Sequence, residues 1–358
     1  MQCLLDLLRG QSSDRTVDAT EWEAALSLAE EHHVLPWATA SLRAHDVSLG
    51  PELSARVSRI EREAAIAAFY WSAELKGVLH AFEEHGVVAV PLKGPFLAER
   101  LYGSTALRAS LDLDLLVSKA NVARAEAVLI AIGFTPGTPD DYHRQWYRGT
   151  TTVELHHDVE NPLAFDFHVE QALHRVRPAD FEGERCWQLT PEVELLFLCL
   201  HGVRHRFERL SLVLDLKLAF EKLGPADAWR PGPETELDSL LILGFAMARR
   251  LQPDISTAIP IPQDTRQTAH LERLADRLWE QLLTQPSEVL DWRALHAFYL
   301  EMELPGSARL GRRWRHAQIL LGRVIEPDYK FAARLGLHRT WQARMLRPLR
   351  ILNDLVRR

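Results

Sequence analysis

Several features that mark common protein classes are missing from this chain of 358 residues. There is no run of about 18 apolar residues, so we expect no membrane span. The first ten residues lack the basic segment and cleavage site of a secretory signal, and we predict a cytoplasmic location. The three cysteines show no metal-binding spacing and suit a reducing compartment. We find no internal repeat.

What the chain does contain is an ordinary globular mixture, with 47% hydrophobic and 25% charged residues. Its net charge of −7 is unevenly distributed, because residues 307–358 hold 12 Arg and one Lys against three acids. Such a basic tail can bind an anionic partner, or it can be a solvated helical face that complements an acidic body. We favour the helical face, because no nucleic-acid-binding motif accompanies the charge.

Hydrophobic spacing divides the chain into three regions. Residues 1–85 are predicted to be helical, with a long alanine-rich helix over 52–85. Residues 86–175 change to short β-branched and alternating segments and form the predicted core. Residues 176–358 are assigned to a C-terminal helical domain with the basic tail, because helical spacing returns after about residue 190. The predicted class is therefore α+β, with a small mixed sheet flanked by an N-terminal and a C-terminal helical region.

Strands and helices alternate in the middle region. VVAVPL, residues 87–92, is typical of a buried strand, and Pro95 suits the first turn of the helix that follows. LDLDLLV, residues 111–117, alternates and predicts a second strand. A helix over 120–132 and a hairpin that turns near Gly149 complete the predicted core.

Asp112 and Asp114 stand two residues apart in the second predicted strand. Alternation along a strand directs both carboxylates to one face, about 7 Å apart, with Leu111, Leu113 and Leu115 directed into the core. Two carboxylates on a rigid strand suit Mg²⁺, which prefers oxygen ligands. A polar strand edge that faces water is the commoner explanation of an isolated Asp-x-Asp pair, so the neighbouring residues decide.

Other residues of this region would complete a site for a phosphorylated ligand. Lys93 and Gly94 lie where the first strand turns into a helix, a place where backbone N–H groups and an ammonium can hold phosphate. A third carboxylate is expected on a neighbouring strand. We choose Glu154, with Asp158 as its competitor, and expect His156 on the same face to contact phosphate or an acceptor.

Together these residues resemble the polymerase-β-type nucleotidyltransferase superfamily. Within it, the sequence is similar to a divergent bacterial group of uncharacterised nucleotidyltransferases. The motifs of that group read here as Leu92-Lys93-Gly94, Arg108 before Asp112 and Asp114, and Glu154-Leu155-His156. Farther along the chain, matching positions are occupied by His201, His205, Arg209 and Asp215.

The resemblance implies transfer of a nucleoside monophosphate from an NTP, by default ATP, to an acceptor, with release of pyrophosphate. It implies Mg²⁺, or else Mn²⁺, held by the catalytic residues Asp112, Asp114 and Glu154. Contacts to nucleotide or phosphate are expected from Lys93, Gly94, Arg108, His156, His201 and His205. The acceptor stays open between a small molecule, a peptide or protein, and RNA.

Two other functions stay open. A transferase fold that has lost turnover could bind nucleotide as an antitoxin-like or scaffold protein, and the basic tail could serve a transferase that modifies RNA. His201 and His205, at i and i+4, would need a third ligand to hold zinc, so we place them in the cleft or at a domain interface, with Asp215 as a candidate partner.

The superfamily begins its site with a Gly-Ser turn, and two glycines compete for that place. Gly103-Ser104 is a literal match, but Gly103 follows a predicted helix and is better explained as its C-terminal cap. We therefore choose Gly94 as the turn, although Pro95 follows it where the superfamily has serine.

Overall fold

The computed structural model describes residues 1–11, 18–45, 47–139, 142–159, 165, 168–223, 236–256, 266–284, 292–302 and 314. The chain divides into two compact units, the first made of Met1–Asn161 and Phe167–Asp291 and the second of Pro162–Asp166 and Trp292–Arg358. These bounds differ from the three regions expected from the sequence, and that division stays a prediction. Apart from Trp314, the basic tail lies outside the described residues.

In the second unit, the structure describes one helix, α12 (Trp292–Glu301). Tyr299 of this helix packs edge-on against Phe165, with 4.9 Å between the ring centroids.

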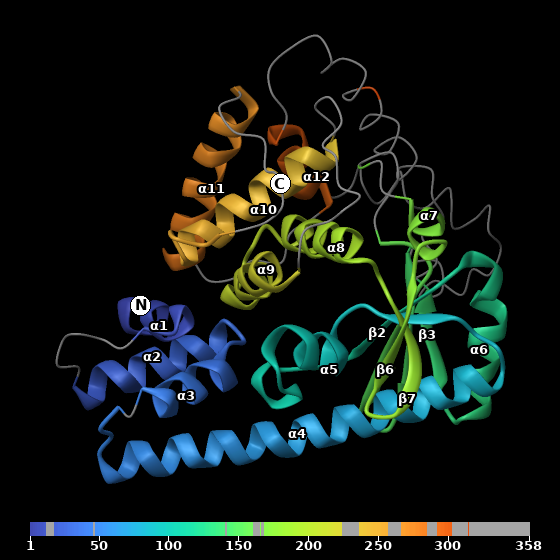
Figure 1. Ribbon diagram of the computed structural model, residues 1–358, viewed down its shortest axis with the longest axis horizontal. Coiled ribbons are helices and arrows are strands. Elements are labelled where there is room, and N and C mark those ends of the chain that lie inside the picture. The colour runs from blue at the N-terminus through green and yellow to red at the C-terminus, as the bar shows by residue number, and fades with distance from the viewer. Residues whose placement is uncertain are drawn as a thin grey trace, which may run out of the picture. The chain divides into compact units, whose positions relative to one another are not determined.

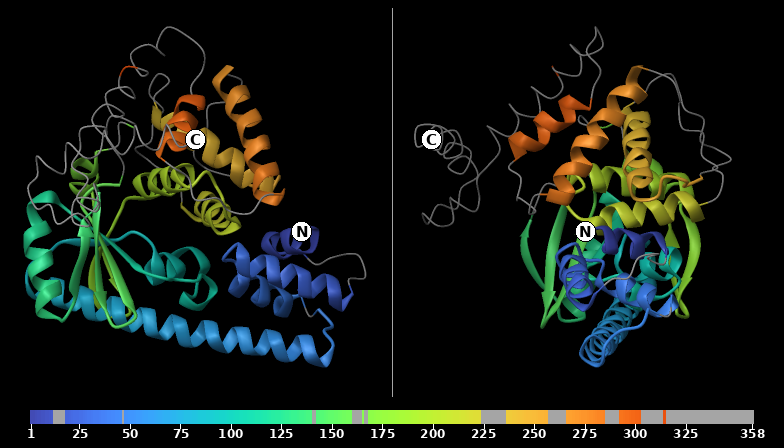
Figure 2. Two further views of the ribbon diagram at one scale, coloured as in Figure 1. Left: turned by 180° about the vertical axis from the view of Figure 1, so that it is seen from behind. Right: turned by 90° about the vertical axis from the view of Figure 1, so that its left-hand side faces the viewer.

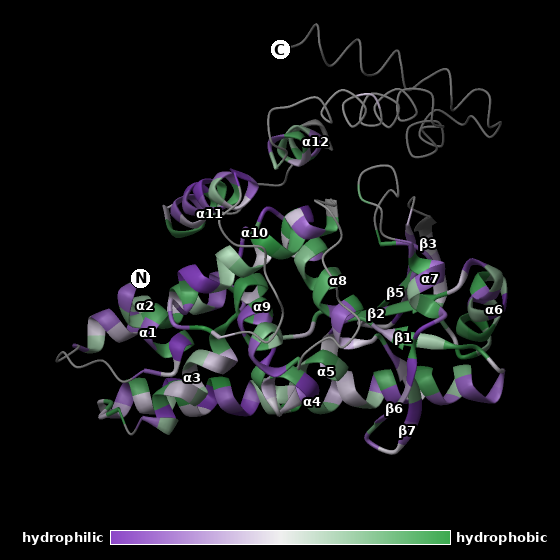
Figure 3. Cartoon of the chain, turned by 45° about the horizontal axis from the view of Figure 1, so that its top comes forward, coloured by the Kyte–Doolittle hydropathy of each residue, from purple (hydrophilic) through white to green (hydrophobic). Residues whose placement is uncertain are grey.

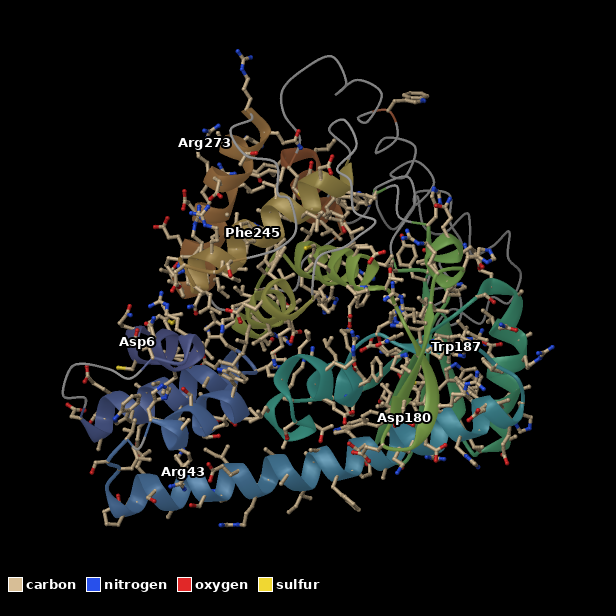
Figure 4. All side chains as sticks on the ribbon, viewed as in Figure 1. Asp6, Arg43, Asp180, Trp187, Phe245 and Arg273 are labelled. Atoms are coloured by element: carbon tan, nitrogen blue, oxygen red, sulfur yellow. The ribbon has the colours of Figure 1, made fainter. Side chains whose placement is uncertain are left out.

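The first unit begins with α1 (Gln2–Arg9), α2 (Ala19–Glu31), α3 (Leu35–Ala44) and α4 (Pro51–Glu84). A capping box starts α2, because the Asp18 carboxylate accepts the Glu21 N–H at 2.8 Å while the Glu21 carboxylate faces the Asp18 N–H. Arg43, labelled in Figure 4, joins α3 to α4 through hydrogen bonds to Ser58 and Glu61.

The predicted long helix over 52–85 is confirmed as α4, which contacts α3 near one end and β7 near the other. Figure 1 shows it in blue beneath these elements, and the view from behind in Figure 2 shows the same arrangement. Because α4 spans 34 residues, it links the N-terminal helices to the sheet in one rigid element.

A five-stranded mixed sheet forms the centre of the unit, in the order β1-β2-β5-β4-β3. The strands are β1 (Ala89–Pro91), β2 (Leu113–Val117), β3 (Thr135–Pro139), β4 (His143–Arg148) and β5 (Thr151–His156). β2 and β5 pair in parallel, whereas the other neighbours pair antiparallel. The predicted small mixed sheet and the hairpin at Gly149 are thereby confirmed.

The connection from β1 to β2 carries the residues of the predicted turn. It runs through α5 (Gly94–Leu97), a π-helical turn η1 (Ala98–Tyr102) and a 3₁₀ turn η2 (Thr105–Leu107). Gly103 ends η1 with a φ of 80°, and its N–H donates to the Glu99 carbonyl at 3.0 Å. Gly103 is therefore a helix C-cap, as predicted.

One face of the sheet packs on α4 and on α6 (Val122–Ala131), which follows the 3₁₀ turn η3 (Lys119–Asn121). Leu113, Leu115 and Leu155 are buried in this core. Leu111 is instead 65% exposed, so the prediction that it points into the core was wrong. The reason is that β2 begins only at Leu113, and strand alternation does not extend into the preceding bend.

A hairpin of β6 (Arg177–Phe181) and β7 (Glu184–Gln188), preceded by α7 (Val169–Leu173), lies where the sequence predicted a helical region from residue 176. Glu182 and Gly183 have φ values of 48° and 88°, which is the two-residue turn that favours a hairpin. Phe181 joins the core against α4, while most of the hairpin is hydrophilic, purple in Figure 3.

Four helices complete the unit: α8 (Pro191–Arg204), α9 (Leu210–Lys222), α10 (Glu236–Leu251) and α11 (Arg266–Thr284). α10 packs against α8, α9 and α11, and α8 is largely hydrophobic, green in Figure 3. The left-handed residues Arg206 and Phe207 separate α8 from α9. No helix in the described ranges is both long and apolar enough to cross a membrane.

Two glycine-to-alanine substitutions test this packing in opposite directions. A Cβ on Gly244 of α10 would clash with Cys199 Sγ of α8, so Gly244→Ala should destabilise the protein by about 1–3 kcal/mol. Gly77 of α4 has open space around it, so Gly77→Ala should stabilise by about 0.5–1 kcal/mol. Urea unfolding measures both, and a Gly244→Ala variant as stable as the parent, or more stable, would contradict the packing of α10 on α8.

Candidate functional site

A pocket of about 270 Å³ opens beside the sheet face that is not covered by α4. Its lining combines residues from the β1–β2 region and β5 with residues from the α2–α3 turn, α8 and the start of α9. From the predicted set, it contains Lys93, Gly94, Arg108, Asp112, Asp114, Glu154, His201 and His205. The structure therefore brings eight of the nine predicted site residues to one pocket, and His156 lies directly behind Asp114 and Glu154.

The parallel register of β2 and β5 places two carboxylates side by side. Asp114 pairs with Glu154, and Leu116 pairs with His156. One ligand atom each from Asp114, Glu154 and His156 lies within 4.8 Å of the others. Asp112 lies in the bend before β2, where it lines the pocket without belonging to this group of three.

Positive groups hold the central carboxylate in its charged form. Burial alone would raise the pKa of Asp114, but the Lys93 ammonium, 3.1 Å away, and the hydrogen bond from His156 bring it well below its usual range. Burial would lower the pKa of His156, yet its hydrogen bonds to Asp114 and Glu154 raise it. Contacts with Lys93 and His156 therefore offset part of the cost of burying the Asp114 charge.

The Asp112 carboxyl responds differently to the same surroundings. Burial and the neighbouring Asp114 charge raise its pKa to about 6, in spite of the Lys93 charge. The negative charges of Asp112, Asp114 and Glu154 therefore repel one another. A bound cation would relieve this repulsion.

Glu154 is held in place by residues that the sequence analysis missed. Gln145 of β4 donates to Glu154 Oε1 at 2.8 Å, and the Tyr147 hydroxyl donates to Gln145 at 2.7 Å. His143, also on β4, stacks on His156 with 4.9 Å between centroids and lies 3.8 Å from Glu154. Alternation along β4 puts His143, Gln145 and Tyr147 on one face of the strand. The polar residues at every second position of HRQWYR could have predicted this face from the sequence.

The residues present fit a divalent cation. Asp114 Oδ2 is buried without a hydrogen-bond partner among the described residues, and so is His156 Nδ1. A buried carboxylate oxygen that lacks a partner is unfavourable unless a cation or water completes it. Oxygen ligands from Asp112, Asp114 and Glu154 suit Mg²⁺ or Mn²⁺. His156 is not counted among these ligands, because its Nε2 already contacts the carboxylates of Asp114 and Glu154.

Gly94 occupies a position that favours glycine. Its φ is 66°, in the left-handed region, and a Cβ there would lie 3.4 Å from the Asp112 carbonyl oxygen. The turn therefore brings the backbone close to the strand that carries the carboxylates. That its N–H groups bind phosphate stays a prediction.

Arg108 contacts a carboxylate outside the cluster. Its Nε and Nη2 donate to the two oxygens of Asp215, each at 2.9 Å, and the Tyr102 hydroxyl donates to Asp215 Oδ1 at 2.6 Å. This buried network joins the entry of β2 to α9. Asp215 was considered as a partner of His201 and His205, but it pairs with Arg108. The reason is that α8 ends before His205 and Asp215 lies on the separate helix α9.

His201 and His205 lie at the C-terminal end of α8, and both face the pocket. The two imidazole rings contact each other edge-on, with 4.7 Å between their centroids, and His201 also stacks on Phe197. Burial and the Lys93 charge lower the pKa of His201, which keeps the ring neutral. The described residues place no carboxylate or thiol with this pair in a group of metal ligands.

Asp158, the competitor of Glu154, binds elsewhere. Its carboxylate lies 3.1 Å from Lys119 Nζ and also accepts the Val159 N–H. It follows the end of β5 and does not line the pocket. The geometry therefore favours Glu154 as the third carboxylate.

Residues 18–249 match the family described as uncharacterised nucleotidyltransferase, over more than half of the chain. The chain belongs to this family. The family resemblance inferred from the motifs is thereby confirmed, and the sheet with its carboxylates lies inside the matched range.

Two solved structures of the antibiotic-resistance factor ANT(2'')-Ia are similar to this nucleotidyltransferase family member: a solution structure, and a crystal structure in complex with adenylyl-2''-tobramycin. Each is 12% identical with a TM-score of 0.31, and the match covers 59% of this chain and 94% or 97% of the other. At this TM-score the likeness carries no argument about function. No curated protein matches the chain.

Removing Asp215 should be strongly destabilising. Asp215→Ala leaves a buried guanidinium and a buried hydroxyl without their acceptor, which should cost about 3–5 kcal/mol of unfolding free energy. Asp276→Ala is the matched control, because it removes an exposed partner of Arg250 and should cost less than about 1 kcal/mol. Equal losses in denaturant unfolding would contradict the structural role of the Arg108–Asp215 pair.

Proposed function

We propose that this protein transfers a nucleoside monophosphate from an NTP to an acceptor, with a divalent cation held by Asp112, Asp114 and Glu154. The observation that carries the proposal is the parallel register of β2 and β5, which places Asp114 beside Glu154 at the wall of a pocket. Membership of a nucleotidyltransferase family supports the same class of reaction.

The proposed reaction forms one bond to phosphorus and breaks one. An acceptor oxygen or nitrogen attacks the α-phosphorus, and the bond from that phosphorus to the bridging oxygen breaks. Pyrophosphate leaves with the bonding electron pair, and the proton of the acceptor passes to water. A bound Mg²⁺ or Mn²⁺ would neutralise developing charge on the phosphate oxygens.

Each residue of the site has a proposed task. Asp112, Asp114 and Glu154 direct their oxygens to the cation, and Gln145 and His156 fix the orientation of Glu154. Lys93 and Gly94 provide an ammonium and a close backbone turn for the phosphates of the NTP. Arg108 lies in the segment that leads into β2, and its bonds to Asp215 hold this segment against α9. This contact keeps Asp112, in the same segment, in position. Catalysis would then rest on positioning and on electrostatics.

The direct test uses each of the four NTPs, labelled on the α-phosphate, with Mg²⁺ or Mn²⁺ and a cell extract as the source of acceptors. We expect a labelled product and released pyrophosphate with at least one of them, ATP being the first choice. Absence of both across all four nucleotides would refute the proposal. The chemical nature of the labelled product identifies the acceptor class.

Three variants should strongly reduce this activity. Asp112→Asn, Asp114→Asn and Glu154→Gln each remove one charged ligand at nearly constant volume, and we expect turnover to fall at least about 100-fold. Asp158→Asn is the matched control on the same stretch of chain, because Asp158 pairs with Lys119 away from the pocket. An equal loss in Asp158→Asn would contradict the assignment of Glu154.

A variant of Gln145, which contacts Glu154, should change the Mg²⁺ concentration that the activity requires more than it changes nucleotide binding. Gln145→Met removes the donor to Glu154 Oε1 and keeps a side chain of similar length. The Mg²⁺ concentration for half-maximal activity should then rise about 10-fold or more. Tyr147→Phe, one bond farther away, should have a smaller effect in the same titration.

A further inference from the structure

Phosphate binding in the pocket requires positive charge that carboxylates do not already balance. Lys93 Nζ lies 3.1 Å from Asp114, and the Arg108 guanidinium uses two donors on Asp215. The two cations predicted from the sequence are thus both paired with acids. A triphosphate is strongly anionic, so its terminal phosphates call for a further cation in the same pocket.

Arg209 is a third basic side chain of the pocket lining, besides Lys93 and Arg108. Within the described part of the chain, its ion-pair partner is Glu208, whose Oε1 lies 4.0 Å from Arg209 Nε. This separation is too long for a hydrogen bond. With the side chain 37% exposed, the planar set of N–H donors remains available to an anion.

His33 enters the same pocket from the turn between α2 and α3. Its φ of 57° lies in the left-handed region, which is uncommon for a residue with a Cβ. The Ser211 N–H donates to the His32 carbonyl at 3.2 Å, which ties this turn to the first turn of α9, next to Arg209. Two elements far apart in the sequence are therefore fixed together at this side of the pocket.

The electrostatics at His33 agree with this placement. Burial lowers its pKa, and the charges of Arg209 and then Arg108 lower it further. A neutral imidazole offers one N–H donor and adds no positive charge beside the arginine. The pair therefore presents directed donors from a guanidinium and an imidazole.

We propose that Arg209 and His33 form a phosphate subsite that takes the β- and γ-phosphates of the NTP. This rests on the proposed function, because the reaction is what brings a triphosphate to the carboxylates. Planar N–H donors of arginine match two phosphate oxygens at once, and the imidazole adds a third donor. A phosphate on the acceptor has the same chemistry, and the experiment separates the two sources.

The experiment measures binding by calorimetry with three probes in the presence of Mg²⁺: inorganic pyrophosphate, AMP, and an ATP analogue with a methylene bridge between the α- and β-phosphates. In Arg209→Ala, we expect pyrophosphate and the analogue to bind about tenfold more weakly, with AMP unchanged. Arg209→Lys should lie between, and His33→Ala should show a smaller loss for the same two probes.

Arg59→Ala is the matched control. Arg59 lies on α4 outside the pocket lining, is 64% exposed, and has its carboxylate partner Glu63 at the same 4.0 Å. Loss of one positive charge there should leave all three affinities unchanged. Thermal unfolding should show that Arg209→Ala folds as the parent does, because the arginine is partly exposed.

Three results would overturn the subsite. They are unchanged binding of pyrophosphate and analogue in Arg209→Ala, an equal loss for AMP, and a loss for pyrophosphate without a loss for the analogue, which would point to a phosphorylated acceptor. Failure of the proposed function can be distinguished from failure of the subsite. If the parent protein binds pyrophosphate through Arg209 but transfers no nucleotide, the subsite proposal stands and the transferase proposal is refuted. A parent that transfers nucleotide while Arg209→Ala binds all probes normally loses only the subsite.

Discussion

The parallel pairing of β2 with β5 is the constraint on which the candidate site depends. It sets Asp114 opposite Glu154, and alternation along both strands sends Leu113, Leu115 and Leu155 to the other face, against α4 and α6. A slip of one residue would turn the carboxylates toward the hydrophobic core and the leucines toward the pocket. The hydrophobic core therefore fixes the register, and the register places Asp114 and Glu154 side by side.

Charge balance explains how acids can stand so close together in a partly buried place. Lys93 and His156 compensate Asp114 and Glu154, whereas Asp112 keeps a raised pKa. The second constraint is the buried contact of Arg108 with Asp215, which ties the entry of β2 to α9. Since α9 begins directly after Arg209, the same contact holds the opposite wall of the pocket in a fixed relation to the carboxylates.

Much of the central region could be predicted because its signals are local. The alternation of LDLDLLV, the left-handed glycines and the long apolar spacing of α4 each act over a few residues. Errors came where local and non-local effects compete. Leu111 looks like a strand residue but precedes β2, and the Glu182-Gly183 turn makes a hairpin inside a stretch read as helical, because Phe181 is buried against α4.

The sequence by itself determined which chemistry is available: an Asp-x-Asp pair at the start of a strand, a lysine at a glycine turn, and the motifs of a nucleotidyltransferase family. Only the tertiary structure decided which residues act together. Arg108 meets Asp215 across 107 positions, Gln145 orients Glu154 from a neighbouring strand, and His33 reaches the pocket of Arg209 from the N-terminal helices. Such pairings depend on strand order and helix packing, which are set by burial of side chains distant in the sequence and leave no periodic signal near the residues that they join.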